Sequence, residues 1–418
     1  MRNLIKRRLL SAAAGIAAFA AIAACSSGGG GTAGGQGTSG SGSSTITIGG
    51  AGPISSSQLS QPERQAAEQA AISTINAAGG VDGHLLKLDY CDTQNTANGE
   101  FTCMRQLVSD KVAAIVDPGL IVDQSGRGLK FATAEGIPVI GGQGLTPVEF
   151  TTPGSFPMAS GIPGWSYGQV VSLIKAGSKK IALFGTNDPG SAYILSYTTQ
   201  AMQLAGIKPV RTVVTDPNAD PTFAEGAAEV IAGGVDGVIF DSSPTYGDKA
   251  IQALRAAGYK GPIASITGVY TPAMTKALGA TANNLYLTSQ MALGTDTSNP
   301  GVSAFLAAMK KYQPSGELDE TSMTAWTAVQ LFADVAKTIK GGITGESVMA
   351  AMNNLSAPVS LQTAGSYTVK GVSSPIKGYP RIFNPTVVIG VVKNGVLEPF
   401  SKGFVDPFTS LSAGNSGS

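Results

Sequence analysis

The sequence predicts an α/β fold made of two similar lobes, each built on a doubly wound parallel sheet. From residue 45 onward, short apolar runs rich in β-branched residues alternate with longer helical stretches, a pattern typical of parallel sheets covered on both faces. The alternation forms two series, one before about Met158 and one after about Trp165. About 370 residues follow Ser44, too many for one ordinary core, so two lobes are expected.

The first series has four expected strands and three expected helices. Pro62 suits the first turn of the first helix, and Gly79 suits its end. Ala67, Ala71 and Ile75 lie on one side of that helix and mark its buried face. The strands are expected at 45–51, 84–90, 112–117 and 137–142, and the helices at 62–78, 98–109 and 123–135.

The second series repeats the alternation and then changes. Its expected strands are 180–185, 209–215, 235–241 and 262–267, and its expected helices are 192–204, 222–232 and 246–257. After Tyr286 three helical stretches follow, at 301–312, 320–340 and 344–353, and then a β-rich tail that contains "TVVIGVV".

The N-terminus predicts a secretory signal. A basic head precedes an apolar run over 9–24, which would reach roughly 24 Å as a helix and fall short of a ~30 Å hydrocarbon core. The run ends in "IAAC", which resembles the lipobox of bacterial lipoproteins, where cleavage leaves the cysteine as the lipid-bearing first residue. Cys25 is therefore the expected lipid attachment site, and an ordinary signal peptide with an incidental cysteine is the alternative.

A Gly/Ser-rich segment separates this cysteine from the lobes. Ser26 to Ser44 contains nine Gly and six Ser, a composition that cannot bury a core, so a flexible tether is expected. Loss of residues 1–24 would remove four basic and no acidic residues, leaving 24 basic against 27 acidic residues. A mature charge of about −3 gives no electrostatic footprint for nucleic acid.

The remaining cysteines favour a disulfide over a metal site. Cys91 and Cys103 are separated by eleven residues and can oxidise outside the cytoplasm, with two buried free thiols as the alternative. His84 is the single histidine, which argues against zinc. The sequence has no phosphate-binding loop and no dinucleotide fingerprint, so neither a metal nor a cofactor is expected.

Two short motifs resemble functional sites, but each lacks residues that its function requires. "GWSYG" matches a nucleophile elbow around Ser166, but the mechanism needs a histidine later in the chain, and His84 is upstream. Ser166 is thus expected to be a helix-start residue. "TDPNADP" begins like a calcium loop but places Pro221 and Ala227 where glycine and glutamate are required. No enzyme activity is expected, and a hydrolase remains a remote alternative.

The strand ends predict where a ligand would bind. Ligands of open parallel sheets bind beyond the carboxyl ends of the strands, and two lobes place two such edges face to face. Each candidate segment also fits ordinary loop or helix-cap chemistry. The segments are 53–58, 119–123, 143–146, 187–190, 242–246 and 267–270. Trp165 and Tyr167 fit either a cleft wall or helix packing.

Several motifs in order resemble one family. "ITIGGAGPISSS", "INAAGGVDGHLLKLDYCD", "RQLVSDKVAAIVDPG", "AEGIPVIGGQGLTP", "KKIALFGTNDPGSAY" and "ATANNLYLTSQ" closely resemble the branched-chain amino-acid-binding family of extracytoplasmic solute receptors. The resemblance covers about residues 45–400. It implies a type I periplasmic-binding fold with two lobes joined by three hinge strands, and Cys91 and Cys103 look like a disulfide pair of some relatives.

The resemblance also implies a division of the chain. The hinge crossings are expected near 157–160, 289–292 and 357–365. The first lobe then comprises 45–158 plus 290–360, and the second comprises 159–289 plus 361–412. Residues 1–24 form the signal peptide, 25–44 the anchor and tether, and 413–418 a flexible tail.

The ligand positions that the resemblance implies depart from the family's amino-acid binders. Those proteins hold the ligand carboxylate with hydroxyl-rich turns, where this chain has Leu120, Gln143 and Leu145. The carboxylate that meets the ligand ammonium is matched here by Thr267, although Asp241 or Asp188 could substitute from another loop. A buried ammonium without an anion would be costly.

A ligand other than an ordinary branched-chain amino acid is therefore expected, such as a neutral polar or aromatic molecule. Pro189 replaces an expected aromatic residue, with Tyr193 or Tyr246 as stand-ins. The expected ligand-binding residues are Ser57, Gln58, Leu120, Gln143, Leu145, Thr146, Asn187, Asp188, Ser243, Tyr246 and Thr267.

The resemblance implies solute capture by hinge closure and delivery to an ABC-type permease. The expected partners are a small molecule, the permease subunits and the membrane through a lipid anchor, and the chain is expected to be a monomer on the outer face of the cell membrane. A ligand sensor of the same fold that signals to a membrane partner is the alternative.

Overall fold

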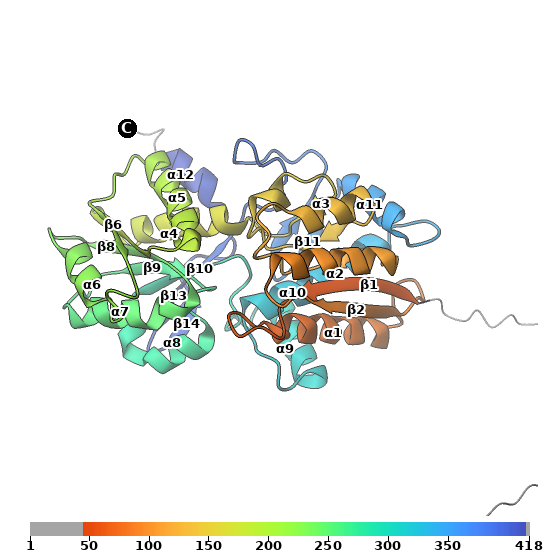
Figure 1. Cartoon of the computed structure of the whole chain (residues 1–418), viewed down its shortest axis with the longest axis horizontal. Coiled ribbons are helices and arrows are strands. Elements are labelled where there is room, and N and C mark those ends of the chain that lie inside the picture. Colours follow the sequence, from red (N-terminus) through yellow and green to blue (C-terminus); the bar gives the residue numbers. More distant parts are fainter. Residues whose placement is uncertain (1–44, 415–418) are drawn as a thin grey trace, which may run out of the picture. The chain divides into compact units, whose positions relative to one another are not determined.

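A five-stranded parallel sheet forms the centre of the first lobe in the computed structural model, which describes residues 45–414. The strand order is β2-β1-β3-β4-β5, and the colours of these strands run from red to yellow (Figure 1). Their bounds are β1 Ile46–Gly52, β2 Leu86–Asp92, β3 Ile115–Val116, β4 Val139–Ile140 and β5 Ser155–Phe156.

Helices cover both faces of this sheet because its strands alternate their apolar side chains. Val116 and Ile140 join the core under α1 and α10, whereas Ile115 and Val139 join the core under α2 and α3. The helices of this lobe are α1 Pro62–Ala77, α2 Ala97–Ser109, α3 Arg127–Ala134, η1 Pro147–Phe150, α9 Pro300–Tyr312, α10 Glu320–Ala336 and α11 Gly345–Asn353.

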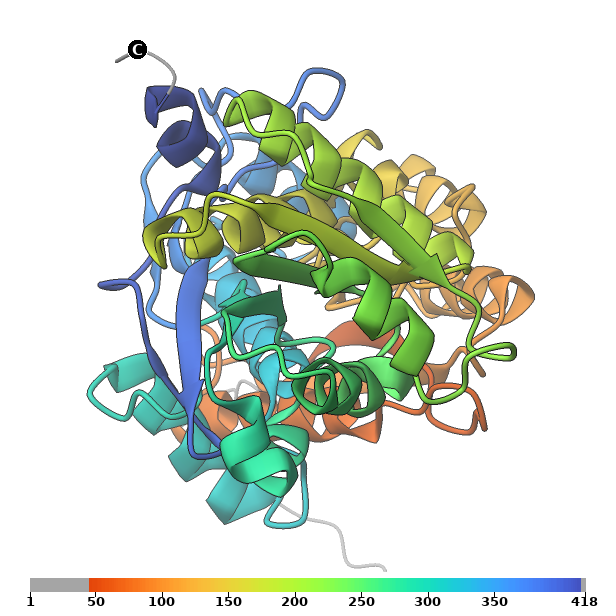
Figure 2. The ribbon, with the colours of Figure 1, turned by 90° about the vertical axis from the view of Figure 1, so that its left-hand side faces the viewer.

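A seven-stranded mixed sheet forms the second lobe, in the order β14-β13-β10-β9-β8-β6-β7. Its central pairs are parallel, but β13 runs antiparallel to both β10 and β14, and Figure 2 shows β13 in blue along one edge of the green strands. The bounds are β6 Ile181–Thr186, β7 Thr212–Thr215, β8 Gly237–Asp241, β9 Ile263–Ile266, β10 Leu285–Ser289, β13 Val388–Lys393 and β14 Val396–Pro399.

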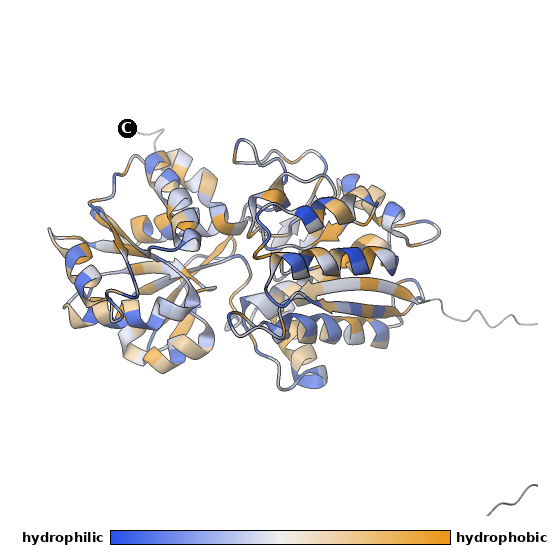
Figure 3. Cartoon of the chain, in the orientation of Figure 1, coloured by the Kyte–Doolittle hydropathy of each residue, from blue (hydrophilic) through white to orange (hydrophobic). Residues whose placement is uncertain are grey.

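The second sheet follows the same alternation rule. Along β6, Ile181 and Leu183 face α4, α5 and α12, whereas Ala182 and Phe184 face α6 and α7. Apolar residues accordingly concentrate along the strands, with hydrophilic residues on the outer helical faces (Figure 3). The helices are α4 Gly161–Lys175, α5 Pro189–Leu204, α6 Ala224–Ile231, η2 Pro244–Tyr246, α7 Gly247–Ala256, α8 Pro272–Leu278, η3 Gly279–Ala282 and α12 Pro407–Gly414.

The predicted two-lobed α/β class is confirmed, while some local predictions differ. Ser166 is the sixth residue of α4 rather than a helix-start residue. The helix begins at Gly161, whose positive φ of 67° suits the turn by which the chain enters the helix. Leu361, Tyr367 and Phe383 pack in the core of the first lobe, although the predicted boundary placed them in the second. They belong to or follow a short hairpin, β11 Val359–Leu361 and β12 Gly365–Tyr367, and the chain rejoins the second sheet only at β13.

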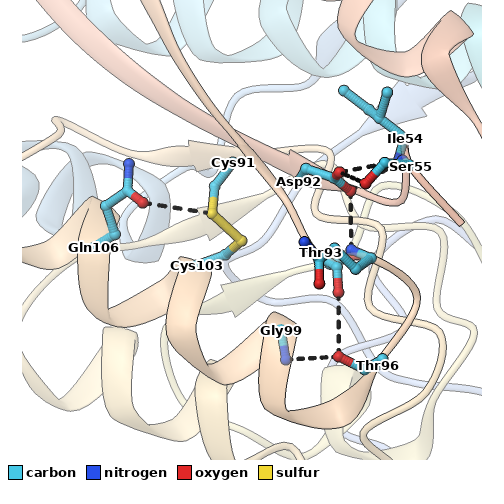
Figure 4. The surroundings of a disulfide bond; sticks show 10 residues. Ile54, Ser55, Cys91, Asp92, Thr93, Thr96, Gly99, Cys103 and Gln106 are labelled. Carbon is cyan, nitrogen blue, oxygen red and sulfur yellow. Dashed lines mark hydrogen bonds between the residues drawn. A yellow bond between two sulfur atoms is a disulfide. The ribbon is translucent and has the colours of Figure 1, made fainter.

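A disulfide joins Cys91 to Cys103 and ties the end of β2 to α2 (Figure 4). The neighbouring Asp92 carboxylate accepts the N–H groups of Ile54 at 2.9 Å and Ser55 at 3.1 Å, so the same strand end also holds the loop after β1. The predicted pairing is therefore present in the structure. Cys25, the signal segment and most of the predicted C-terminal tail lie outside the described residues.

Candidate functional site

A cavity of about 310 Å³ lies where the carboxyl ends of both sheets meet, and we call it the cleft. The first lobe contributes loops before α1 and after β3 and β4, together with the start of α10. The second lobe contributes α4, the first turns of α5 and the ends of β6, β8 and β9. The lining residues are Leu59, Gln61, Ile121, Gln143, Leu145, Trp165, Asp188, Gly190, Ser191, Ile194, Ser242, Ser243, Pro244, Ile266, Gly268, Val269, Glu320 and Thr321.

Four of the predicted ligand-binding residues line this cleft, and the others lie elsewhere. Gln143, Leu145, Asp188 and Ser243 are in its wall. The remaining positions are buried in or packed on their own lobe, exposed away from the wall, or turned toward another cavity. Leu120 is in the core beside α2, Thr146 bonds Glu149, Tyr246 packs on Phe223, Thr267 lines a neighbouring cavity, and Ser57, Gln58 and Asn187 are exposed.

Arg64 of α1 organises the first-lobe wall from behind. Its guanidinium is fully buried and donates from Nη1 to Asp117 Oδ2 at 2.7 Å. It also donates from Nη2 to Gln143 Oε1 at 2.6 Å and from Nε to Gln61 Oε1 at 3.0 Å. Because Arg64 occupies both amide oxygens, it fixes the orientation of the two cleft glutamines without facing the cleft itself.

Two further side chains bury their polar atoms near this ion pair. The carboxyl oxygens of Glu68 have no hydrogen-bond partner within the described protein, and neither has the hydroxyl of Tyr90. Burial, reinforced by the nearby Asp117, holds the pKa of Glu68 well above its usual range, against the opposing effect of Arg64. Burial also raises the pKa of Asp117 to about 6, against the opposing effect of Arg64. Asp117 is therefore the anion that balances Arg64.

Asp241 does not reach the cleft, although it follows β8. Its carboxylate accepts Gln169 Nε2 at 2.6 Å and Thr198 Oγ1 at 2.8 Å, both beneath the wall. Asp188 does line the cleft, where it also caps α5 by accepting the N–H of Ser191 at 3.0 Å. Asp241 and Asp188 were the two candidates to replace the carboxylate that this chain lacks after β9. Only Asp188 lines the cleft.

Glu320 supplies a second carboxyl to the cleft, and no motif or spacing in the sequence distinguishes it as a site residue. It is the first residue of α10, yet it accepts Ser289 Oγ at 3.1 Å, the N–H of Gln290 at 3.0 Å and the hydroxyl of Thr267. An acidic residue at a helix start fits ordinary capping, which hides this role. Burial raises its pKa to about 8.

The charges on the cleft wall have one sign. Asp188 lines it as a carboxylate and Glu320 as a carboxyl whose raised pKa keeps it mostly protonated at pH 7, together with amides and hydroxyls, and no lysine or arginine is among its described lining residues. Apolar side chains, including Leu59, Leu145 and Ile194, make up much of the rest. This wall suits an uncharged, partly apolar molecule better than an anion, for which no side-chain cation is in place.

The family follows from comparison of the whole chain. A model of the periplasmic binding protein family matches residues 45–369. The chain belongs to this family. Periplasmic binding proteins act outside the cytoplasm, so membership implies an extracytoplasmic location. A comparison with curated proteins finds no match.

Solved structures share the type I periplasmic-binding fold at low sequence identity. An extracellular ligand-binding receptor from Verminephrobacter eiseniae is 20% identical, with a TM-score of 0.72 over 85% of this chain and 99% of that one. The branched-chain amino acid binder LivJ from Streptococcus pneumoniae, solved with isoleucine, is 21% identical, with a TM-score of 0.66 over 85% and 98%. A fatty acid ABC transporter substrate-binding protein from Thermomonospora curvata is 14% identical, with a TM-score of 0.70 over 88% and 94%. The family model confirms the resemblance to extracytoplasmic solute-binding proteins that the sequence motifs indicated, and these structures confirm the expected fold.

Neither a metal centre nor a membrane span is found within residues 45–414. No group of three or more His, Cys, Asp and Glu side chains is arranged there to hold a metal ion. No helix of that range is both long and apolar enough to cross a bilayer.

Replacement of Asp117 by Asn should destabilise the first lobe strongly. Arg64 would keep its buried charge without its anion, and breaking such a pair costs about 3–5 kcal/mol. Urea unfolding measures the change. The matched control is Lys393→Ala, which removes an exposed pair with Glu398 worth about 0–1 kcal/mol. Equal small losses in both variants would contradict the role assigned to Arg64.

Replacement of Glu320 by Gln should change how stability depends on pH. The native carboxyl keeps its proton up to about pH 8, whereas the unfolded chain loses it near 4.5, so wild-type stability falls as the pH rises through this window. The variant lacks this loss. Its unfolding free energy relative to wild type should therefore rise from pH 4.5 to 8, by at most about 1.4 kcal/mol per pH unit. A difference that stays flat would contradict the burial of an ionisable carboxyl at this position.

Proposed function

We propose that this protein is an extracytoplasmic solute-binding lipoprotein that captures a small molecule in the cleft and delivers it to an ABC-type permease. The observation that carries the proposal is a cleft lined by the strand ends of both sheets, together with membership of the periplasmic binding protein family. Closure of the lobes about their connecting segments would bury the ligand, and the ligand would undergo no covalent change. Several structures of the same fold are described as ABC transporter proteins, which supports a permease as the partner.

The proposed ligand is a neutral molecule with a substantial apolar part, and not a standard branched-chain amino acid. Leu120 and Leu145 offer no hydroxyl to a carboxylate, and the hydroxyl of Thr267 is engaged by Glu320. The amide of Gln143 and the hydroxyls of Ser242 and Ser243 supply hydrogen bonds that a neutral polar group can use. The fold does not dictate the ligand, since one similar structure holds isoleucine and another is described as a fatty acid transporter protein.

Native mass spectrometry should detect a carried ligand on protein purified from cell extract. Gly268→Phe is the test variant, because a Cβ there meets only ordinary contacts, with Ile266 Cδ1 at 3.5 Å and Trp165 Cη2 at 3.7 Å, while the ring would enter the cleft. We expect the variant to fold and to lose the ligand. Calorimetric binding of leucine, isoleucine or valine at micromolar or lower concentration would refute the ligand class, while leaving solute capture intact.

Replacement of Cys25 by Ala should abolish lipid attachment. Cells labelled with an alkyne-bearing palmitate analogue should incorporate label into the wild type and not into the variant, and the variant should leave the membrane fraction. Ser26→Ala, one residue away, is the matched control and should keep the label. Mass spectrometry that finds residues 1–24 on the mature protein would contradict the proposed anchor.

A further inference from the structure

A second cavity, of about 440 Å³, lies beside the segment that leaves the second sheet after β10. We call it the hinge-side cavity. The second lobe, the segment after β10 and the first lobe all contribute to its wall. Its lining residues are Thr267, Tyr270, Pro272, Thr275, Lys276, Ser289, Ala292, Leu293, Gly294, Thr295, Phe305, Leu306, Leu318, Asp319, Glu320, Met323, Asn394, Gly395, Val396 and Leu397.

The wall of the hinge-side cavity is mainly apolar. Tyr270, Phe305 and Met323 are almost fully buried and contribute wall from three different elements. Leu318 and Val396 also line it, yet they are 47% and 52% exposed and so are among the few large apolar side chains of residues 45–414 that face solvent. Apolar surface that remains exposed beside an apolar cavity is typical of a binding site.

The bond between Glu320 and Thr267 separates this cavity from the cleft. Ile266 and Gly268 line the cleft, whereas Thr267, between them, lines the hinge-side cavity. Glu320 contributes to both walls. Its oxygens already accept hydrogen bonds from Thr267, Ser289 and Gln290. The Glu320 carboxyl therefore needs no polar ligand group as a partner.

We propose that the hinge-side cavity is a second binding site, which takes an uncharged apolar small molecule. Its volume falls within the range of about 300–1,000 Å³ that is common for ligand pockets. A charged group placed among Phe305, Leu306 and Met323 would lose hydration without gaining a partner, which excludes ions from the deep part. The site is distinct from the proposed solute cleft and does not depend on that function.

An occupant of this cavity would contact both lobes at once. Leu293 belongs to the connecting segment, Phe305 to the first lobe and Leu397 to the second. The proposed lobe closure would move these surfaces relative to one another, so a bound molecule would favour the arrangement in which all three contact it; this effect rests on the proposed function, whereas the binding site itself does not. The shared side chain of Glu320 gives a direct physical link between occupancy of the two sites.

Fluorescence titration of the mature protein with 1-aminoanthracene, an uncharged apolar probe, tests the proposal. Gly294→Phe is the blocking variant, because a Cβ at Gly294 would meet only Met323 Cε, at 4.0 Å, and the ring can fill the cavity. Gly268→Phe is the matched control, since it places the same ring in the cleft. We expect saturable binding to wild type that persists in Gly268→Phe, where the ring fills the cleft, and that becomes at least tenfold weaker when Gly294→Phe is present.

Val396→Asp provides a second variant that does not depend on tolerance of a buried ring. Val396 is exposed, so the fold should accept the charge, and circular dichroism checks the fold of all three variants against wild type. The carboxylate at the cavity should weaken probe binding at least fivefold. Absence of saturable binding to wild type would overturn the proposal. Loss of binding in Gly268→Phe with retention in Gly294→Phe would also overturn it, by showing that the probe occupies the cleft.

Discussion

A single buried cation determines the shape of the first-lobe wall. Arg64 projects from α1 and meets Asp117 at the end of β3, Gln143 after β4 and Gln61 at the start of its own helix. An uncompensated guanidinium inside a protein is so unfavourable that all three partners must stay in place. The positions of the cleft glutamines are therefore a consequence of charge balance beneath the surface, because the ion pair that holds α1 to the end of β3 also holds both amides.

Alternation of strands and helices was sufficient to predict the lobes, because a parallel sheet with apolar side chains on both faces must be covered by helices on both sides. The same pattern was less informative after α11, where the chain passes from the first lobe to the second for the last time. The hairpin of β11 and β12 reads as part of a β-rich tail, yet Tyr367 and Phe383 complete the core of the first lobe. Such an assignment depends on which core a side chain enters, and local pattern does not contain that information.

The residues of the candidate site likewise fall into those that the sequence could place and those that it could not. Gln143, Leu145, Asp188 and Ser243 follow strands, and topology alone brings strand ends to a common edge, so sequence could place them. Glu320 lies 53 residues after Thr267, begins a helix of the other lobe and resembles a helix-capping residue. Its function depends on a contact made only after both lobes have formed. Arg64 was missed for a related reason, since a basic residue in an amphipathic helix is usually a solvated one.

The disulfide has a bearing on how the protein must be prepared. Cys91 precedes Asp92, whose carboxylate fixes the loop that leads to Leu59 and Gln61 at the edge of the cleft (Figure 4). A reducing cytosol keeps cysteines as thiols, and recombinant protein made there would lack the covalent tie beside this loop. Export to an oxidising compartment thus also allows the disulfide to form. It completes the covalent structure next to the cleft, and binding measurements on the purified protein call for periplasmic expression or oxidative refolding.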